Sequence, residues 1–157
     1  MRRRIGKYRV AAVVGMSAAL TLAALVADGH AQEIKPQSEK EIAAQGGVQL
    51  TGPQVVATLT GNTAYAMRLT GGPTLPKGTV VPLFYRDART RVARGPTVIE
   101  APWWTDGNQV CADNKVEKIG HVCGTMHRLG NGFYFCERST RVCEWYFRVV
   151  PGNAEKL

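Results

Sequence analysis

Short runs of β-branched and aromatic residues, interleaved with polar ones, follow one another from Thr63 onward. Such runs, divided by turn sequences rich in Gly, Pro, Asn and Asp, are typical of β-strands. They predict eight strands, at Ala64–Leu69, Thr79–Arg86, Thr90–Arg94, Pro102–Thr105, Gln109–Cys111, His121–Arg128, Gly132–Glu137 and Arg141–Val150. Strands of this length and spacing indicate an antiparallel meander, closed or half closed into a small barrel. In the last strand, Val142, Trp145, Phe147 and Val149 share a face only if a bulge or a twist lies near Cys143 and Glu144.

One short helix is predicted before the strands. Thr51 is its expected N-cap and Pro53 falls in the first turn, where proline is tolerated. Val55, Val56 and Leu59 form its apolar face, Leu50 can pack back against it, and Gly61 is the expected stop. Two helical turns are not stable without a sheet to cover. The predicted fold class is therefore mainly β, with one short N-terminal helix and a small antiparallel β-meander or barrel.

The N-terminal 31 residues have the three parts of a secretory signal peptide. Residues 1–10 contain five basic residues and no acidic one, residues 10–27 are uncharged, and Gly29 and Ala31 place small side chains before a cut at Gln32. An uncleaved membrane anchor is the alternative, although no basic cluster follows the apolar run. No cysteine follows it either, which excludes a lipid-anchored form. The arginines at 2–4 also loosely fit a twin-arginine signal, but a general export signal needs only positive charge.

Segments of different composition define the expected domains. Residues 1–31 are the signal peptide, and residues 32–48 are a polar, flexible lead with a nascent helix at Glu39–Ala44. Residues 49–153 are a single β-rich domain, and residues 154–157 are a tail. The full chain of 157 residues has a net charge of +8. Because the leader holds five of the 20 basic and one of the 12 acidic residues, the mature chain keeps only +4. That charge suits solubility and does not predict a nucleic-acid partner.

The four cysteines all lie in the last third of the chain, and in an exported protein an even, clustered set indicates disulfides. Aromatic, strand-like flanks around residues 136–143 predict a hairpin. Its tip is either a two-residue turn at Ser139 and Thr140 or a four-residue loop, and both place Cys136 opposite Cys143. By elimination, Cys111 pairs with Cys123. A metal or haem site is disfavoured because the close ligand pairs and haem-attachment motif are missing.

Catalytic residues are sparse in the mature chain. His121 and His127 are its only histidines, and they fall on one face of one predicted strand together with Cys123. The common nucleophile, phosphate-binding and metalloprotease motifs do not occur. Surface or edge positions therefore explain both histidines better than catalysis does, and replacing both with Gln is expected to change only stability.

Aromatic residues are concentrated in the C-terminal half, where a barrel core is their first role. Neighbours in a strand face opposite ways, so either Trp103 or Trp104 must point away from that core. An exposed tryptophan beside a basic stretch predicts a contact surface for an envelope protein or an anionic ligand. The predicted surface comprises Trp103, Trp104, Arg86, Arg89, Arg91 and Arg94. A solvated hairpin is the alternative explanation for the arginines.

The segment from Leu50 to Thr63 resembles the opening of small exported bacterial proteins that are classed only as domains of unknown function. The shared pattern is L-[ST]-G-x-x-[IV]-x-x-x-L-[ST]-G-[NK]-T. The strand from Trp103 through Asp106 and Gly107 to Cys111, and a second cysteine a dozen residues later at Cys123, are also similar to that family. Gly152 and Asn153 resemble its C-terminal end, whereas Cys136 and Cys143 are an addition. The resemblance implies an exported protein with a short helix before a β-meander, and no established activity.

Three classes of function remain after these arguments. The first is a periplasmic or secreted, non-catalytic binding or interaction module. The second is a small barrel that carries an apolar or anionic ligand, and the third is an enzyme or metal protein centred on His121 and His127. We expect no cofactor, no metal, no nucleic-acid partner and no membrane span after signal cleavage.

Overall fold

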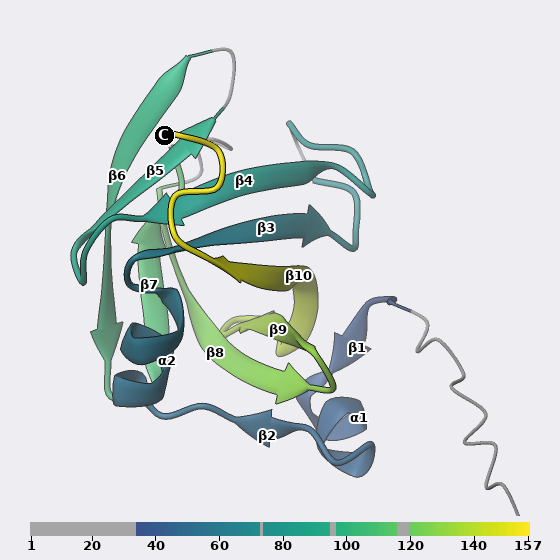
Figure 1. Cartoon of the computed structure of the whole chain (residues 1–157). Coiled ribbons are helices and arrows are strands. Elements are labelled where there is room, and N and C mark those ends of the chain that lie inside the picture. The colour runs from purple at the N-terminus through teal and green to yellow at the C-terminus, as the bar shows by residue number, and fades with distance from the viewer. Residues whose placement is uncertain (1–33, 73, 95–96, 116–119) are drawn as a thin grey trace, which may run out of the picture. The chain divides into compact units, whose positions relative to one another are not determined.

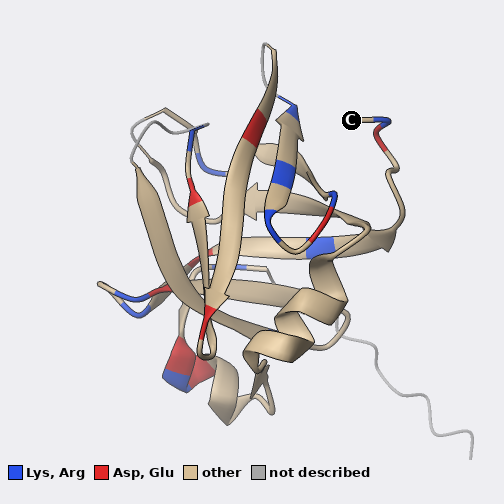
Figure 2. Ribbon diagram, turned by 90° about the vertical axis from the view of Figure 1, so that its left-hand side faces the viewer, with Lys and Arg blue, Asp and Glu red and all other residues tan. Residues whose placement is uncertain are grey.

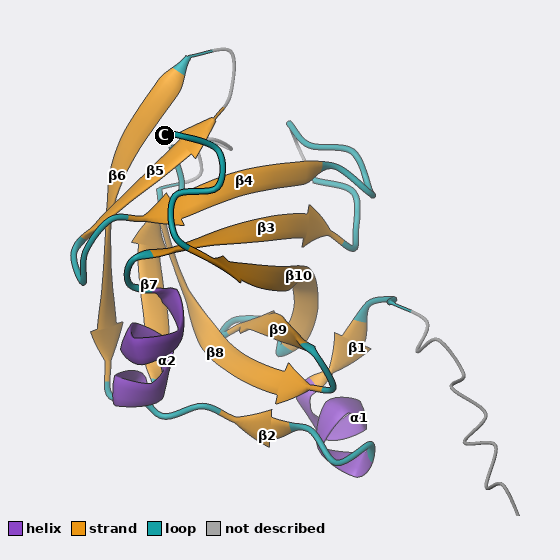
Figure 3. Cartoon of the chain, in the orientation of Figure 1, coloured by secondary structure: helices purple, strands orange, loops and turns teal. Residues whose placement is uncertain are grey.

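All eight runs that the sequence predicts as strands are strands in the computed structural model, which describes residues 34–72, 74–94, 97–115 and 120–157 (Figures 1 and 3). They are β3 (Asn62–Arg68), β4 (Val80–Tyr85), β5 (Thr90–Arg94), β6 (Val98–Asp106), β7 (Gln109–Asp113), β8 (His121–Leu129), β9 (Gly132–Glu137) and β10 (Val142–Pro151). The expected signal peptide, with both export alternatives, lies outside the described residues.

The eight strands close into a barrel. Each pairs antiparallel with the next along the chain, and β10 pairs with β3 as well as with β9. Closure leaves none of them as a free sheet edge. The β9–β10 register shifts between Cys143 and Trp145, where the sequence predicts an irregularity. Because of this shift, Trp145 packs with Phe147 in the barrel core, whereas Cys143 packs with Ile42 on the outside.

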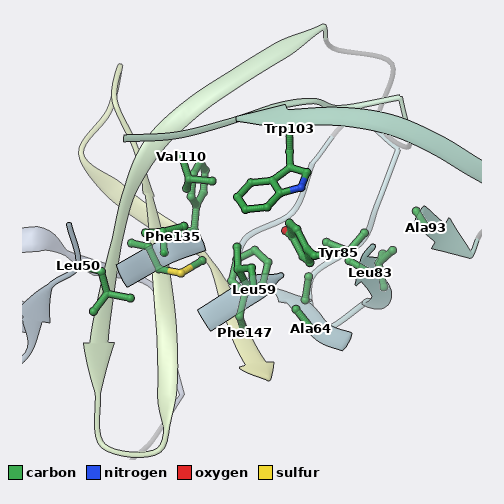
Figure 4. Close-up of a cluster of buried hydrophobic side chains, with 14 residues drawn as sticks. Leu50, Leu59, Ala64, Leu83, Tyr85, Ala93, Trp103, Val110, Phe135 and Phe147 are labelled. Carbon is green, nitrogen blue, oxygen red and sulfur yellow. The ribbon is translucent and has the colours of Figure 1, made fainter. Parts of the chain in front are cut away.

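Helix α2 (Gly52–Leu59) contributes to the barrel interior and confirms the predicted helix. At its start the Gln54 Oε1 accepts a hydrogen bond from the backbone N–H of Thr51 at 2.8 Å. After its end Gly61 takes a φ of +75°, a backbone conformation that glycine adopts without steric penalty. Val55 and Leu59 are fully buried in one cluster with Trp103 and Tyr85, and Figure 4 shows Leu59 beside these two rings.

The expected flexible lead is folded over its described part. Strand β1 (Gln37–Ser38) pairs with the start of β10, helix α1 (Glu39–Ala44) follows, and β2 (Val48–Gln49) pairs with the end of β8 (Figure 1). We call residues 37–49 the strap. The helix within it matches the predicted range, but the prediction that the segment is flexible is wrong for the strap.

A second apolar cluster explains why the strap is ordered. Ile42 of α1 is completely buried against Leu129, Tyr134 and the Cys136–Cys143 pair. Tyr134 and Cys136 alternate with the inward Phe133 and Phe135, so they belong to the outer face of β9. An apolar outer face must be covered, and α1 supplies the cover.

Both disulfide pairings are confirmed, and the structure contains no free cysteine among its described residues. Cys111 and Cys123 are direct partners in the β7–β8 register, with Cα atoms 4.1 Å apart. Cys136 and Cys143 face each other across β9 and β10, with Cα atoms 3.7 Å apart. Four residues separate β9 from β10, so the longer of the two hairpin loops is the one present. In the described part of the chain, every helix is too short or too polar to cross a membrane.

Candidate functional site

The barrel interior is only partly filled. Side chains of α2 pack with Trp103 and Tyr85 in one part, and the remainder is a cavity of about 70 Å³ that opens to solvent. One water molecule needs roughly 10–15 Å³ of such space. The cavity therefore has room for several water molecules or for a small part of a ligand.

The walls of this cavity are mostly apolar, and the apolar residues among them come from six strands of the barrel. The apolar lining residues are Ala66, Val81, Leu83, Val110, Ala112, Val122, Met126, Phe135, Trp145 and Phe147. Mostly apolar walls with few polar groups are typical of small-molecule sites in proteins. The polar lining residues are Tyr85, Arg91 and Asn114.

Arg91 is the only charged side chain among the described residues that line the cavity. It is half-buried on β5, directly opposite Tyr85 on β4 and Ala101 on β6. Its guanidinium donates a hydrogen bond to the carbonyl oxygen of Asp113 at 2.8 Å, which holds it near the end of β7. Backbone carbonyls carry no net charge, so this contact orients the arginine without neutralising it.

The neighbouring tyrosine does not neutralise Arg91 either. Burial raises the pKa of the Tyr85 hydroxyl above its usual value, while the charge of Arg91 and a hydrogen bond from it act in the opposite direction and are outweighed. The phenol is therefore neutral near pH 7. The cavity presents a guanidinium charge to apolar walls with no carboxylate from the described residues beside it.

The predicted contact surface is divided by the structure. Trp103 is only 1% exposed, and its indole N–H donates a hydrogen bond to the carbonyl of Asp87 at 2.8 Å. Its ring meets Tyr85 edge to face, with centroids 5.0 Å apart (Figure 4). Trp103 is therefore a core residue, and its assignment to a contact surface is wrong. The expectation that the two tryptophans occupy different environments holds, because Trp104 is half-buried.

The four arginines of that surface do not lie together either. Arg86 is exposed and pairs with Glu100 at 2.8 Å, a surface ion pair of small energetic value. Arg89 and Arg94 are exposed, and Arg94 donates a hydrogen bond to the carbonyl of Glu155. Arg91 instead lines the cavity. Figure 2 shows basic and acidic segments at several separate places along the strands and loops.

Trp104 lies in a row with the first disulfide. It pairs with Cys111 in the β6–β7 register, and Cys111 pairs with Cys123 on β8. Its ring also meets the His121 ring edge to face, with centroids 5.4 Å apart. The outer face at this point is thus aromatic and disulfide-bonded, and it brings His121 into contact with Trp104 rather than with His127.

His127 occupies a different environment from His121. It is buried beneath the strap, 3.0 Å from the Thr125 hydroxyl and 3.8 Å from a carboxylate oxygen of Glu39. The two histidines are six positions apart along β8, roughly 20 Å of extended chain, so they form no joint site. Glu39, His127 and Cys136 have potential metal ligands within 4.8 Å of one another, but the Cys136 sulfur is in a disulfide and supplies no thiolate.

A pH dependence follows from the burial of His127. Burial lowers its pKa below the usual value, and the Glu39 carboxylate only partly offsets this. The unfolded chain therefore takes up the proton first as the pH falls through about 6.5. We expect the free energy of unfolding to decrease from pH 7.5 toward pH 5, and His127→Gln to remove part of that decrease. Urea unfolding at both pH values measures it. The same change at exposed His121 is the control, and an equal effect of both variants would contradict the assignment.

Comparison of the chain with protein-family models, with curated proteins and with solved structures yields no match in any of the three. The resemblance of residues 50–153 to exported proteins of unknown function therefore stays a prediction. Arguments about function rest on the barrel and its cavity.

The sequence prediction assigned Arg91 to a contact surface, with a solvated hairpin as the alternative, and it did not identify Asn114 or the cavity. One signal was available. Arg91 is two residues from Ala93, a small apolar residue that is buried in the core, and residues at this spacing share a strand face. The arginines at 86, 89 and 94 obscured that alternation.

Proposed function

We propose that this protein is an exported, non-catalytic binding module whose barrel interior takes a small ligand with an apolar part. The observation that carries the proposal is the open, largely apolar cavity of about 70 Å³ inside a closed barrel. Two disulfides support export, because such bonds persist in oxidising compartments. A periplasmic or secreted location is consistent with both the disulfides and the ligand-binding role.

The positions of the predicted contact residues favour a ligand-binding role over a role in contacting a partner protein. A partner protein would need exposed anchors, but Trp103 is in the core and Arg91 lines the cavity. The exposed remainder, Arg86 and Arg89 with half-buried Trp104, lacks the central desolvated cluster that protein interfaces usually have. The third class, an enzyme or metal site at His121 and His127, lacks a shared site for the two histidines.

Hexan-1-ol, a neutral amphiphile, tests whether the cavity accepts a ligand. The methyl NMR signals of Ala112 and Val122, which line the cavity, are expected to shift saturably on titration. The methyls of Val98, which is 59% exposed on β6, serve as the reference. The proposal is refuted if hexan-1-ol shifts the Val98 methyl signals as much as those of Ala112 and Val122, or if it shifts none of these signals.

A variant with a filled cavity provides the matched test. Ala112→Leu adds three carbon atoms at the cavity wall and is expected to weaken hexan-1-ol binding at least about tenfold, since the added atoms occupy the space for the ligand. Ala43→Leu, on the exposed face of α1, makes the same change where there is no cavity and is expected to bind like the wild type. Unchanged binding by Ala112→Leu would place the ligand elsewhere.

A further inference from the structure

Arg91 lines the barrel cavity without an acidic neighbour among the described residues that line it. The residue is half-buried. It contacts the Asp113 carbonyl oxygen and the Tyr85 hydroxyl, which is neutral near pH 7. A charge held partly out of water without a counter-ion lowers stability unless something pairs with it.

Arg68 provides a comparison, because it is a buried arginine with a structural role. Arg68 on β3 is 8% exposed at its side chain and forms an ion pair with Glu144 at 3.0 Å. It also lies over the Trp145 ring, 5.0 Å from its centroid. Arg68 is thus compensated within the chain by a carboxylate. Arg91 differs, because none of the described residues that line its cavity supplies a carboxylate.

We propose that Arg91 anchors the ligand of this barrel, and that the ligand is a small amphiphile with one negative charge. The proposal rests on the proposed function, the binding of a ligand in this cavity. The guanidinium presents planar N–H donors that match a carboxylate in a two-point contact. One arginine balances one negative charge, so a carboxylate fits better than a phosphate monoester, whose charge is about −1.5 to −2 at pH 7.

The cavity also limits the size of the apolar part. An apolar cavity of about 150 Å³ is known to hold benzene, and this cavity is about 70 Å³. A short chain or the edge of one ring fits among Met126, Phe135 and Phe147, and the rest of the ligand must extend toward the opening. The Asp113 contact places the guanidinium near the end of β7, so the acid group binds there and the tail points to the buried wall.

The decisive comparison is between hexanoate and hexan-1-ol on the wild-type protein at pH 7.5, where the acid is ionised. A hydrogen-bonded charge pair is expected to make hexanoate bind about 10- to 100-fold more tightly than the alcohol. The same Ala112 and Val122 methyl signals report both ligands. Hexyl phosphate is expected to bind more weakly than hexanoate. This comparison needs no variant, so it does not depend on whether an altered protein folds.

Variants assign the preference to Arg91. Arg91→Gln removes the charge and is expected to equalise hexanoate and hexan-1-ol, while the affinity for the alcohol stays within about twofold. Arg89→Gln makes the same change at an exposed position of the neighbouring turn and should keep the preference. Arg91→Lys keeps the charge without the planar fork and should retain only part of the preference.

Each outcome decides between the two proposals. Equal binding of hexanoate and hexan-1-ol by the wild type overturns the role of Arg91 but leaves the cavity as a ligand site. A preference for hexanoate that survives Arg91→Gln also overturns it. If neither compound shifts the cavity methyl signals, the proposed function itself fails.

Discussion

Trp103→Ala is expected to lower the free energy of unfolding by about 3–5 kcal/mol, the range seen for large aromatic deletions in cores. Trp103 is 1% exposed and packs edge to face on Tyr85 in the cluster that α2 covers. Its removal leaves a void at this contact and also leaves the Asp87 carbonyl without its indole donor. Urea unfolding followed by far-UV circular dichroism measures the change.

Trp104→Ala is the matched control on the adjacent position of β6. Trp104 is half-buried on the outer face, so its removal creates no closed cavity and should lower the free energy of unfolding much less. A second variant, Trp103→Phe, keeps an aromatic ring, and its free energy of unfolding should lie between those of Trp103→Ala and Trp104→Ala. If Trp104→Ala proved the more destabilising change, the assignment of the two faces of β6 would be wrong.

Breaking both disulfides is expected to lower the free energy of unfolding by about 5 kcal/mol. Closing loops with sequence separations of 12 and 7 residues stabilises a fold by about 2–3 kcal/mol each in the loop-entropy description. Small domains have only about 5–15 kcal/mol of net stability. The reduced and alkylated protein should therefore be partly or wholly unfolded at 37 °C, as measured against the oxidised protein by denaturant titration.

Removal of each disulfide should have a different effect on the strap. Cys136 and Cys143 are completely buried in the cluster that holds Ile42, so replacing this pair with Ala should also loosen the strap. Replacing Cys111 and Cys123 with Ala should leave the strap amides protected, because that bridge lies beside Trp104. Hydrogen exchange at residues 39–44 distinguishes the two pairs. Equal loss of protection in both variants would contradict the separate roles.

Local patterns in the sequence predicted most of the secondary structure. The helix at residues 52–59 was recognisable because Thr51, Pro53 and Gly61 are end signals whose effects act within a few residues. All eight barrel strands were predicted because turn residues divide them at regular intervals. The pairing of Cys136 with Cys143 also followed from spacing within one hairpin, and the alternation of apolar residues indicated a bulge or a twist near Cys143.

Long-range contacts determined the features that bear on function. The alternation of side chains along a strand predicts that Trp103 and Trp104 face opposite ways. Only closure of the sheet, with β10 against β3, decides which face is inside. Closure places Trp103 and Arg91 inward, and it creates the cavity that no single strand contains. The strap is ordered for a similar reason. Its polar sequence has little stability alone, and Ile42 becomes buried only because β8, β9 and β10 present an apolar outer face formed by residues about 90 positions away.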